Sequence, residues 1–366
     1  MKRDDRAPEN KSAIQERREL YRSLSLPGTA EGHEEVVMSA KPFSREVLKI
    51  DPEVVSRQIA DTLRQQVFSQ LKRKGVVLGI SGGIDSSVSA ALCAKALGPE
   101  RVAALLMPEL DSSDDSVRLG GLLAKSLGVE TILEDIGPLL QAAGCYRRRD
   151  EAIRDMVPEY TDRYKSKIVL ANILENEGFN FFRLVVESDS GAQKTVRLTA
   201  KSYLGIVAAT NMKQRARKFY EYYHADRLHY AVAGTPNRLE YDQGFFVKNG
   251  DGAADLKPIA HLYKSQVYQL AAYLSIPEEI QRRPPTTDTY SLQQSQEEFY
   301  FSLPYEKMDL CLYGKNHHVA ASEVANVIGL TTEQVERVYR DIDIKRNTTR
   351  YLHLKPLLAE NVEEIS

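Results

Sequence analysis

The sequence predicts an α/β protein: a doubly wound parallel sheet with flanking helices, a β-hairpin insertion and a helical C-terminal part. Three observations lead to this prediction. Short apolar runs typical of buried strands alternate with segments of helical periodicity from residue 51 to residue 136. Two adjacent glycines, Gly82 and Gly83, follow the first of these strands. Apolar and β-branched residues also lie on both sides of Ser190-Gly191, which is typical of a hairpin.

The first half of the domain contains three predicted strands separated by helices. Residues 51–74 have the spacing of an amphipathic helix and end in basic residues before Gly75. The strand 76–80 follows, and then a helix over about 85–97. Residues 101–108 are a second apolar strand and 129–136 a third strand, and the helix between them begins with capping residues. This alternation favours a parallel sheet.

The second half is less regular. Residues 148–176 are expected to be helical, and the hairpin is expected as an insertion over about 177–200. A long helix is predicted over about 203–225, a fourth strand over 230–233, and shorter helices as far as about 345.

The domain boundaries follow from composition. Residues 1–45 are polar, charged and weakly patterned, so we expect a mobile N-terminal arm. The alternative is an arm that docks on a partner subunit. A single α/β domain is predicted over 46–350 and a C-terminal tail over 351–366.

Composition excludes several classes of function. The 366-residue chain is 42% apolar and 27% charged, which is ordinary for a globular protein. A net charge of -2 predicts no nucleic-acid partner. The cysteines, Cys93, Cys145 and Cys311, are far apart and indicate neither a zinc site nor disulfides. Because there is no bilayer-spanning apolar stretch and no signal peptide, we expect a cytoplasmic protein without a membrane partner.

The segment Ser81-Gly-Gly-Ile-Asp-Ser-Ser87 carries the main chemical signal. Glycines at the carboxyl end of a parallel strand can turn sharply, and the helix that follows offers unpaired N–H groups, so the loop suits a phosphate. It is neither a Walker loop nor a dinucleotide G-x-G-x-x-G loop. An acid beside phosphate needs a cation, so Asp85 suggests Mg²⁺; alternatively, Asp85 only caps the helix.

This loop resembles the pyrophosphate-binding loop of the ATP pyrophosphatases, and further motifs resemble one branch, the ammonia-dependent NAD synthetases. They are Gly234-Thr235, Glu240, Gly244-Phe-Phe, Lys248, Asp251, Asp255, Pro258 and Lys264 in that order, together with "NMKQRARKFY", "RRPPTTD" and "DIKRN". The resemblance extends over about residues 50–350. It implies the adenine nucleotide alpha hydrolase-like fold and an ATP- and Mg²⁺-dependent amidation of deamido-NAD to NAD.

The resemblance also implies roles for individual residues and a homodimer. Asp85, Glu240 and Lys264 would be catalytic, and Asp85 and Glu240 would be the metal ligands. Glu240 follows the Gly-Thr by about one helical turn, which could bring it to the metal of Asp85; alternatively it is a solvated acid. ATP would be bound by Gly79, Ile80, Ser81, Gly82, Gly83, Ile84, Asp85, Ser86, Thr235, Lys264 and Thr286, and deamido-NAD by Arg215, Lys248, Asp255 and Lys345.

Some features depart from the family's pattern. Ile84, Val247 and Ile344 stand where ammonia-dependent members often have glutamine, threonine and histidine, and the segment around 177–200 is longer than expected. One alternative is therefore an ATP-dependent amide ligase for another carboxylate, and another is a silent nucleotide-binding protein. About 50 residues precede the domain, too few for an amidase domain, so we expect free ammonia or a separate ammonia-supplying partner as the nitrogen source.

Overall fold

The computed structural model describes residues 42–170, 182–286, 289–292, 294–296, 300–301 and 303–362. The chain from Phe43 onward forms one compact unit. Almost all of the predicted arm, 1–45, lies outside the described residues. The first described element is the short 3₁₀ helix η1, Arg45–Leu48, whose Leu48 is buried in the C-terminal core.

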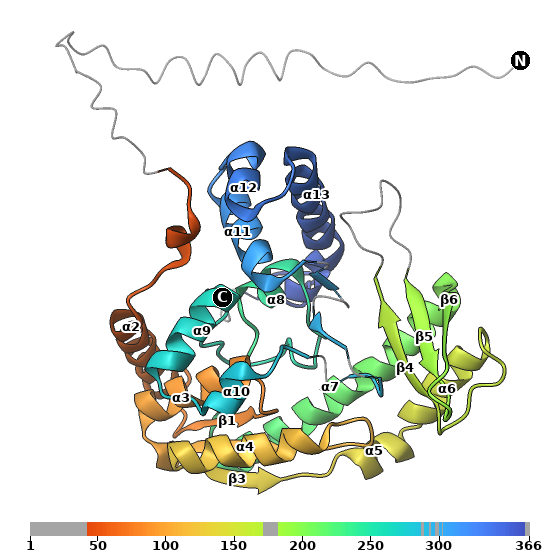
Figure 1. Ribbon diagram of the computed structural model, residues 1–366. Helices are drawn as coiled ribbons and strands as arrows, with labels where there is room; N and C mark the ends of the chain where they lie inside the picture. The colour runs from red at the N-terminus through yellow and green to blue at the C-terminus, as the bar shows by residue number, and fades with distance from the viewer. Residues whose placement is uncertain are drawn as a thin grey trace, which may run out of the picture. The chain divides into compact units, whose positions relative to one another are not determined.

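A four-stranded parallel sheet is the centre of the fold (Figure 1). Its strands are β1 (Val76–Gly79), β2 (Val102–Leu106), β3 (Glu130–Leu133) and β7 (Ala231–Val232), in the order β3-β2-β1-β7. The chain therefore moves outward from β1 to β3 and returns on the other side of β1. This reversal makes the carboxyl ends of β1 and β7 the place where a ligand is expected to bind in such a sheet. All four strands were predicted.

The sheet is doubly wound because side chains on both of its faces are covered by helices. Val76 and Leu78 point into one core, whereas Val77 and Ala103 point into the other. Each fully buried Leu or Val contributes about 1.5–3 kcal/mol, so both faces stabilise the sheet. The first face packs against α2 (Pro52–Arg64), α3 (Ile84–Leu97), α4 (Asp114–Leu127) and α9 (Lys264–Tyr273), and the second against α5 (Gly137–Ala142), α6 (Cys145–Arg154) and α7 (Ala200–Leu228).

A second, three-stranded antiparallel sheet contains the predicted hairpin. Its strands are β4 (Lys165–Val169), β5 (Arg183–Glu187) and β6 (Gln193–Arg197), paired in that order. The prediction of helix over 148–176 was wrong in part, since α6 ends at Arg154 and β4 is a strand. Ser166 and Ile168 alternate with more exposed residues and pair with β5, a distant contact that helical periodicity cannot reveal. Residues 171–181 lie outside the described residues.

Helix α7 connects the two sheets (Figure 1). Ile206, near its start, packs with the antiparallel sheet, and Ala216 and Ala225 pack against the parallel sheet. The helix covers the predicted range 203–225 and extends beyond it at both ends.

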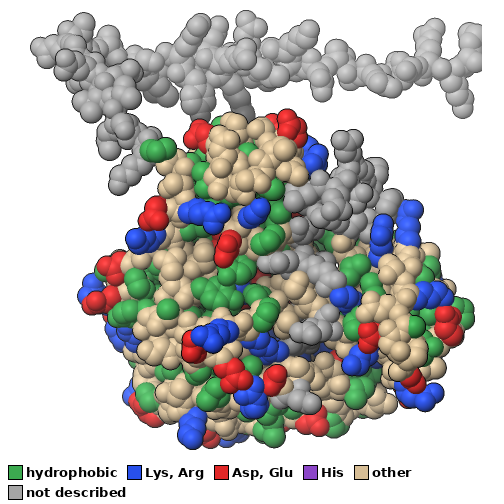
Figure 2. Space-filling model, in the orientation of Figure 1, with side chains coloured by type: hydrophobic (Ala, Val, Ile, Leu, Met, Phe, Trp, Pro, Cys, Tyr) green, Lys and Arg blue, Asp and Glu red, His purple; other side chains and the backbone are tan. Residues whose placement is uncertain are grey.

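The C-terminal part is helical, as predicted. Its core combines buried residues of α11, α12 and α13 with Leu239 of α8. The remaining elements are η2 (Gln65–Gln70), η3 (Pro99–Arg101), α8 (Arg238–Gln243), α10 (Glu278–Arg282), α11 (Tyr305–Asn316), α12 (Ala321–Ile328), α13 (Thr332–Thr349) and η5 (Arg350–His353). On the face drawn in Figure 2, Lys and Arg side chains lie among Asp and Glu side chains. None of the helices in the described ranges has the length and hydropathy needed to cross a bilayer.

Candidate active site

The predicted phosphate loop lies at the carboxyl end of β1, where the strand order reverses. Gly82 has a φ of 70°, and a Cβ built there would lie 2.5 Å from the Cβ of Leu119, so glycine is required both by conformation and by space. Gly83 is the N-cap of α3, and its carbonyl accepts hydrogen bonds from Ser86 and Ser87 at 3.0 and 2.8 Å. The loop thus places the N-terminus of α3 at the carboxyl end of β1, an arrangement that favours binding of an anion.

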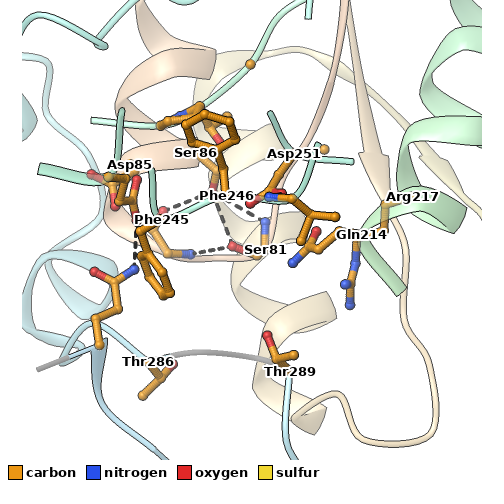
Figure 3. Close-up of a pocket in the computed structure, with 18 of the residues that line it drawn as sticks. Ser81, Asp85, Ser86, Gln214, Arg217, Phe245, Phe246, Asp251, Thr286 and Thr289 are labelled. Atoms are coloured by element: carbon orange, nitrogen blue, oxygen red, sulfur yellow. Dashed lines mark hydrogen bonds between the residues drawn. The ribbon is translucent and has the colours of Figure 1, made fainter. Parts of the chain in front are cut away.

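A pocket of about 540 Å³ opens over this loop and is shown in close-up in Figure 3. It extends from the ends of β1, β2 and β7 to one face of α7 and to the segment around Thr286. The structure brings together nearly all of the residues predicted to bind ATP. Those that line the pocket are Gly79, Ile80, Ser81, Gly83, Ile84, Asp85, Ser86, Thr235, Lys264 and Thr286. Gly82 packs against Leu119 of α4 instead.

Asp85 and Lys264 form an ion pair in this pocket. The Nζ of Lys264 donates to Oδ2 of Asp85, and the side-chain amide of Asn237 donates to Oδ1 at 3.2 Å. Lys264 is 2% exposed. Burial lowers its pKa, but the charges of Asp85 and Glu240 outweigh burial, and the pKa lies above its ordinary value. Lys264 is therefore a fixed positive charge at the phosphate loop.

Asp309 fixes the start of α9 and thereby Lys264. Its carboxylate accepts from the backbone N–H of Lys264 at 3.2 Å and from the backbone and hydroxyl of Ser265, both at 2.7 Å. Burial raises the pKa of Asp309 to about 6, although these donors oppose the rise. The helix start is thus held by a carboxylate from α11.

Glu240 lines the same pocket as the ion pair of Asp85 and Lys264, and a capping box positions it. Asn237 caps α8, and its backbone N–H donates to Oε2 of Glu240 at 3.0 Å. Gln296 donates to Oε1 at 2.9 Å. Burial and the charge of Asp85 raise the pKa of Glu240 to about 8. The carboxylates of Asp85 and Glu240 are therefore close enough for their charges to interact, as is expected of two ligands of one cation.

The residues at this site fit a hard divalent cation bound together with phosphate, but they do not form a complete cage. Asp85 and Glu240 supply the oxygen donors that Mg²⁺ prefers, and Mg²⁺ usually takes its other ligands from phosphate and water. In the described ranges, no group of three or more His, Cys, Asp and Glu residues could hold a metal ion. A cation would thus need oxygen ligands from a bound nucleotide.

The four residues predicted to bind deamido-NAD fall into two pairs. Arg215 and Lys248 line the pocket, and the Nε of Arg215 donates to the carbonyl of Lys248 at 3.3 Å. The other two do not line it. Asp255 accepts from the N–H of Val232 in β7 at 2.7 Å, and Lys345 donates to the carbonyl of Tyr300 at 2.7 Å in a nearly buried position. Binding roles for these two remain predictions.

Two contacts at the pocket were missed from the sequence. Asn237 begins an Asn-x-x-Glu pattern typical of a capping box, so a signal for it was present. Arg283 lies within the quoted motif RRPPTTD, but the motif does not give its partners: its guanidinium donates to the carbonyl of Ser81 at 3.4 Å and to the hydroxyl of Ser113 at 3.1 Å, and both are distant in sequence. Ile344, one of the departures from the family pattern, is 60% exposed.

The fold and the site together define a nucleotide-binding α/β protein with a phosphate loop beside two carboxylates and a lysine. The profile of the family described as NAD synthase matches residues 55–161 and 155–349. This chain belongs to that family. The NH(3)-dependent NAD(+) synthetase of Rhizobium meliloti (strain 1021) is 62% identical over 323 residues, which cover 88% of this chain and 96% of the relative.

More distant relatives agree with this assignment. The NH(3)-dependent NAD(+) synthetase of Thermotoga neapolitana is 32% identical over 303 residues, covering 80% of this chain and 98% of the relative. The solved structure of the NH3-dependent NAD synthetase from Campylobacter jejuni has a TM-score of 0.55 at 22% identity and covers 85% of this chain and 100% of that chain. The last comparison supports the fold.

Proposed function

We propose that this protein is an ammonia-dependent NAD synthetase, which converts deamido-NAD, ATP and ammonia to NAD, AMP and pyrophosphate. The observation that carries the proposal is the position of Lys264, Asp85 and Glu240 beside the phosphate loop, in a chain 62% identical to a relative named for this activity. Ammonia would be taken directly or from a separate protein that supplies it.

The first step joins the nicotinate carboxylate to AMP. A carboxylate oxygen of deamido-NAD attacks the α-phosphorus of ATP, and pyrophosphate leaves with the electron pair of the broken bond. The N–H groups of the phosphate loop and the ammonium of Lys264 stabilise the charge that develops on the departing group. Catalysis then needs positioning and charge stabilisation rather than a protein nucleophile.

Asp85 and Glu240 would hold Mg²⁺ together with the ATP phosphates. When bound, Mg²⁺ would neutralise charge on the pyrophosphate. The raised pKa of Glu240 supports this role, because burial and the nearby charge of Asp85 both disfavour its charged form, which a bound cation would favour.

In the second step, ammonia attacks the acyl carbon of the adenylate, AMP leaves and the amide of NAD forms. Arg215 of α7 and Lys248, whose carbonyl it contacts, are among the cationic residues that line the pocket, and we propose that they bind deamido-NAD. Asp255 and Lys345 would contribute only if their present contacts change on binding. A homodimer and a cytoplasmic location complete the proposal.

The proposal is tested by incubating the protein with ATP, Mg²⁺, NH₄⁺ and deamido-NAD. We expect NAD and AMP in equal amounts. Nicotinate mononucleotide is the informative comparison, because it carries the same carboxylate but lacks the adenylate half. Faster AMP formation with another carboxylate would identify a different amide ligase, and ATP binding without any pyrophosphate release would indicate a silent nucleotide-binding protein.

A further inference from the structure

Lys213 is a fully buried cation that the proposed mechanism does not use. It lies on α7, and its side chain is 0% exposed. Thr210 and Arg217 are its neighbours at helical spacing, and both line the pocket. Lys213 itself is not exposed to the pocket, because groups from two other segments cover its ammonium. A buried lysine is costly unless every donor is used, so these contacts need a reason.

Each N–H of the Lys213 ammonium has an acceptor. Nζ lies 3.0 Å from Oε1 of Glu109 and 2.5 Å from Oδ2 of Asp111, both in the loop that follows β2. The third acceptor is the carbonyl of Thr289, at 2.9 Å. Lys213 therefore joins α7 to two segments that are otherwise separated by more than a hundred residues of sequence. Figure 3 labels Thr289 and Gln214 among the residues that line the pocket.

Helix α6 also contacts the loop that follows β2. The hydroxyl of Tyr146 donates to Oε2 of Glu109 at 2.9 Å and accepts from the N–H of Leu110 at 3.3 Å. Arg149 donates to Asp111, on the same Oδ2 that Lys213 contacts. Charged and buried groups of α6 and α7 thus hydrogen-bond to this loop and restrict its movement.

The two segments held by Lys213 both contribute to the pocket that opens over the phosphate loop. Met107, Pro108 and Ser112, from the loop after β2, line it, as does Thr289. Arg283 connects the same regions, because it donates to Ser81 in the phosphate loop and to Ser113. Arg215 and Arg217 of α7 line the same pocket.

We propose that Lys213 is a positioning residue for ATP: it fixes the loop after β2 and the segment at Thr289 at the separation that the nucleotide requires. The proposal rests on the proposed function only for the identity of the nucleotide. A lysine is suited to this role because three donors on one atom can hold three acceptors from two segments.

The test compares Lys213→Met with the double variant Lys213→Met/Glu109→Gln. The single change leaves an excess buried carboxylate, so it is expected to lower stability whatever Lys213 does. The double variant restores the net charge of the cluster but not the link to Thr289. Affinities for α,β-methylene ATP with Mg²⁺ and, separately, for deamido-NAD are measured by calorimetry. We expect the double variant to bind the ATP analogue about ten- to a hundredfold more weakly and deamido-NAD within about twofold of wild type.

An unchanged affinity for the ATP analogue in the folded double variant would overturn the proposal, and so would an equal loss for both ligands. If circular dichroism shows that the double variant does not fold, Tyr146→Phe tests the same loop. We expect it to weaken binding of the analogue at least about threefold, and no change would overturn the proposal. Tyr339→Phe is the matched control, because it removes a hydroxyl that donates to Val319 in the C-terminal helices.

Formation of NAD by the wild-type protein is scored separately. A protein that binds the ATP analogue but makes no NAD would contradict the proposed function, whereas the effect of Lys213 on ATP affinity would still be decided by the variants.

Discussion

Lys264 donates a hydrogen bond to the carboxylate of Asp85, a residue 179 positions earlier in the chain. One partner stands in the first turn of α3 and the other begins α9, and both helices pack on the same face of the parallel sheet. The ion pair of Asp85 and Lys264 therefore joins the starts of two helices that are far apart in the sequence and meet at the end of β1. Since Lys264 is buried, loss of its partner would leave an uncompensated charge.

Asp85→Asn is expected to reduce pyrophosphate release by at least about a hundredfold, because it removes a negative partner of Lys264 and a proposed Mg²⁺ ligand. It should also lower the free energy of unfolding by about 3–5 kcal/mol, the usual effect of breaking a buried pair. Deamido-NAD-dependent pyrophosphate release and urea denaturation measure the two effects.

Asp115→Asn is the control for this variant. Asp115 pairs with Arg118 on the exposed side of α4. Exposed pairs contribute about 0–1 kcal/mol, so activity and stability should both stay close to wild type. Near-wild-type turnover of Asp85→Asn would contradict the role assigned to Asp85.

Gly82→Ala tests the conformation of the phosphate loop. A residue with a Cβ at a φ of 70° costs about 1–2 kcal/mol, and the contact with Leu119 at 2.5 Å adds to this cost. We therefore expect a loss of at least about 1–2 kcal/mol in the free energy of unfolding, together with weaker ATP binding. Denaturant titration and calorimetry are the measurements.

Gly121→Ala is the matched control, since nothing lies within 4 Å of a Cβ at this position inside α4. Alanine is favoured over glycine in a helix interior by up to about 1 kcal/mol, so this variant should be more stable than wild type. If the two glycine variants behaved alike, the loop argument would fail.

Arg215→Ala is expected to raise the KM for deamido-NAD at least about tenfold, the loss typical of a hydrogen bond to a charged group. The KM for ATP should change less than about twofold, because Arg215 lies on the α7 side of the pocket. Steady-state kinetics with each substrate varied in turn gives both values. A larger effect on ATP would refute the assignment.

The nitrogen donor is tested by comparing NH₄⁺ with glutamine. We expect efficient NAD formation only with NH₄⁺, because the chain resembles the ammonia-dependent type and its 62% identical relative is named for NH(3). NAD is quantified by its absorbance after enzymatic reduction. Efficient use of glutamine by the purified protein alone would contradict this expectation.

The sequence was most informative where local chemistry and sheet topology agree. The strands β1 and β2 are continuous apolar runs, and the loop Ser81–Ser87 has a glycine, Gly82, at a positive φ. Glu240 was expected about one helical turn beyond Gly234-Thr235, and it lies in the first turn of α8 and lines the pocket. These features depend on neighbours in the sequence.

Features that depend on distant partners were not predictable in the same way. β4 is a strand because it pairs with β5, and Arg283 reaches the phosphate loop across two hundred residues. The contact of Lys345 with the carbonyl of Tyr300 likewise arises from the packing of α13, whereas its pair with Asp341 lies within the helix. A motif assigns a residue to a helix, but the tertiary structure decides what that residue touches.

The most direct test of the account follows an oxygen atom. Deamido-NAD labelled with ¹⁸O in its nicotinate carboxylate is incubated with the protein, ATP, Mg²⁺ and NH₄⁺, and the products are analysed by mass spectrometry. If the carboxylate attacks the α-phosphorus beside Asp85 and Lys264, AMP will carry one labelled oxygen and pyrophosphate none. Unlabelled AMP, or ADP and labelled phosphate in its place, would contradict the account.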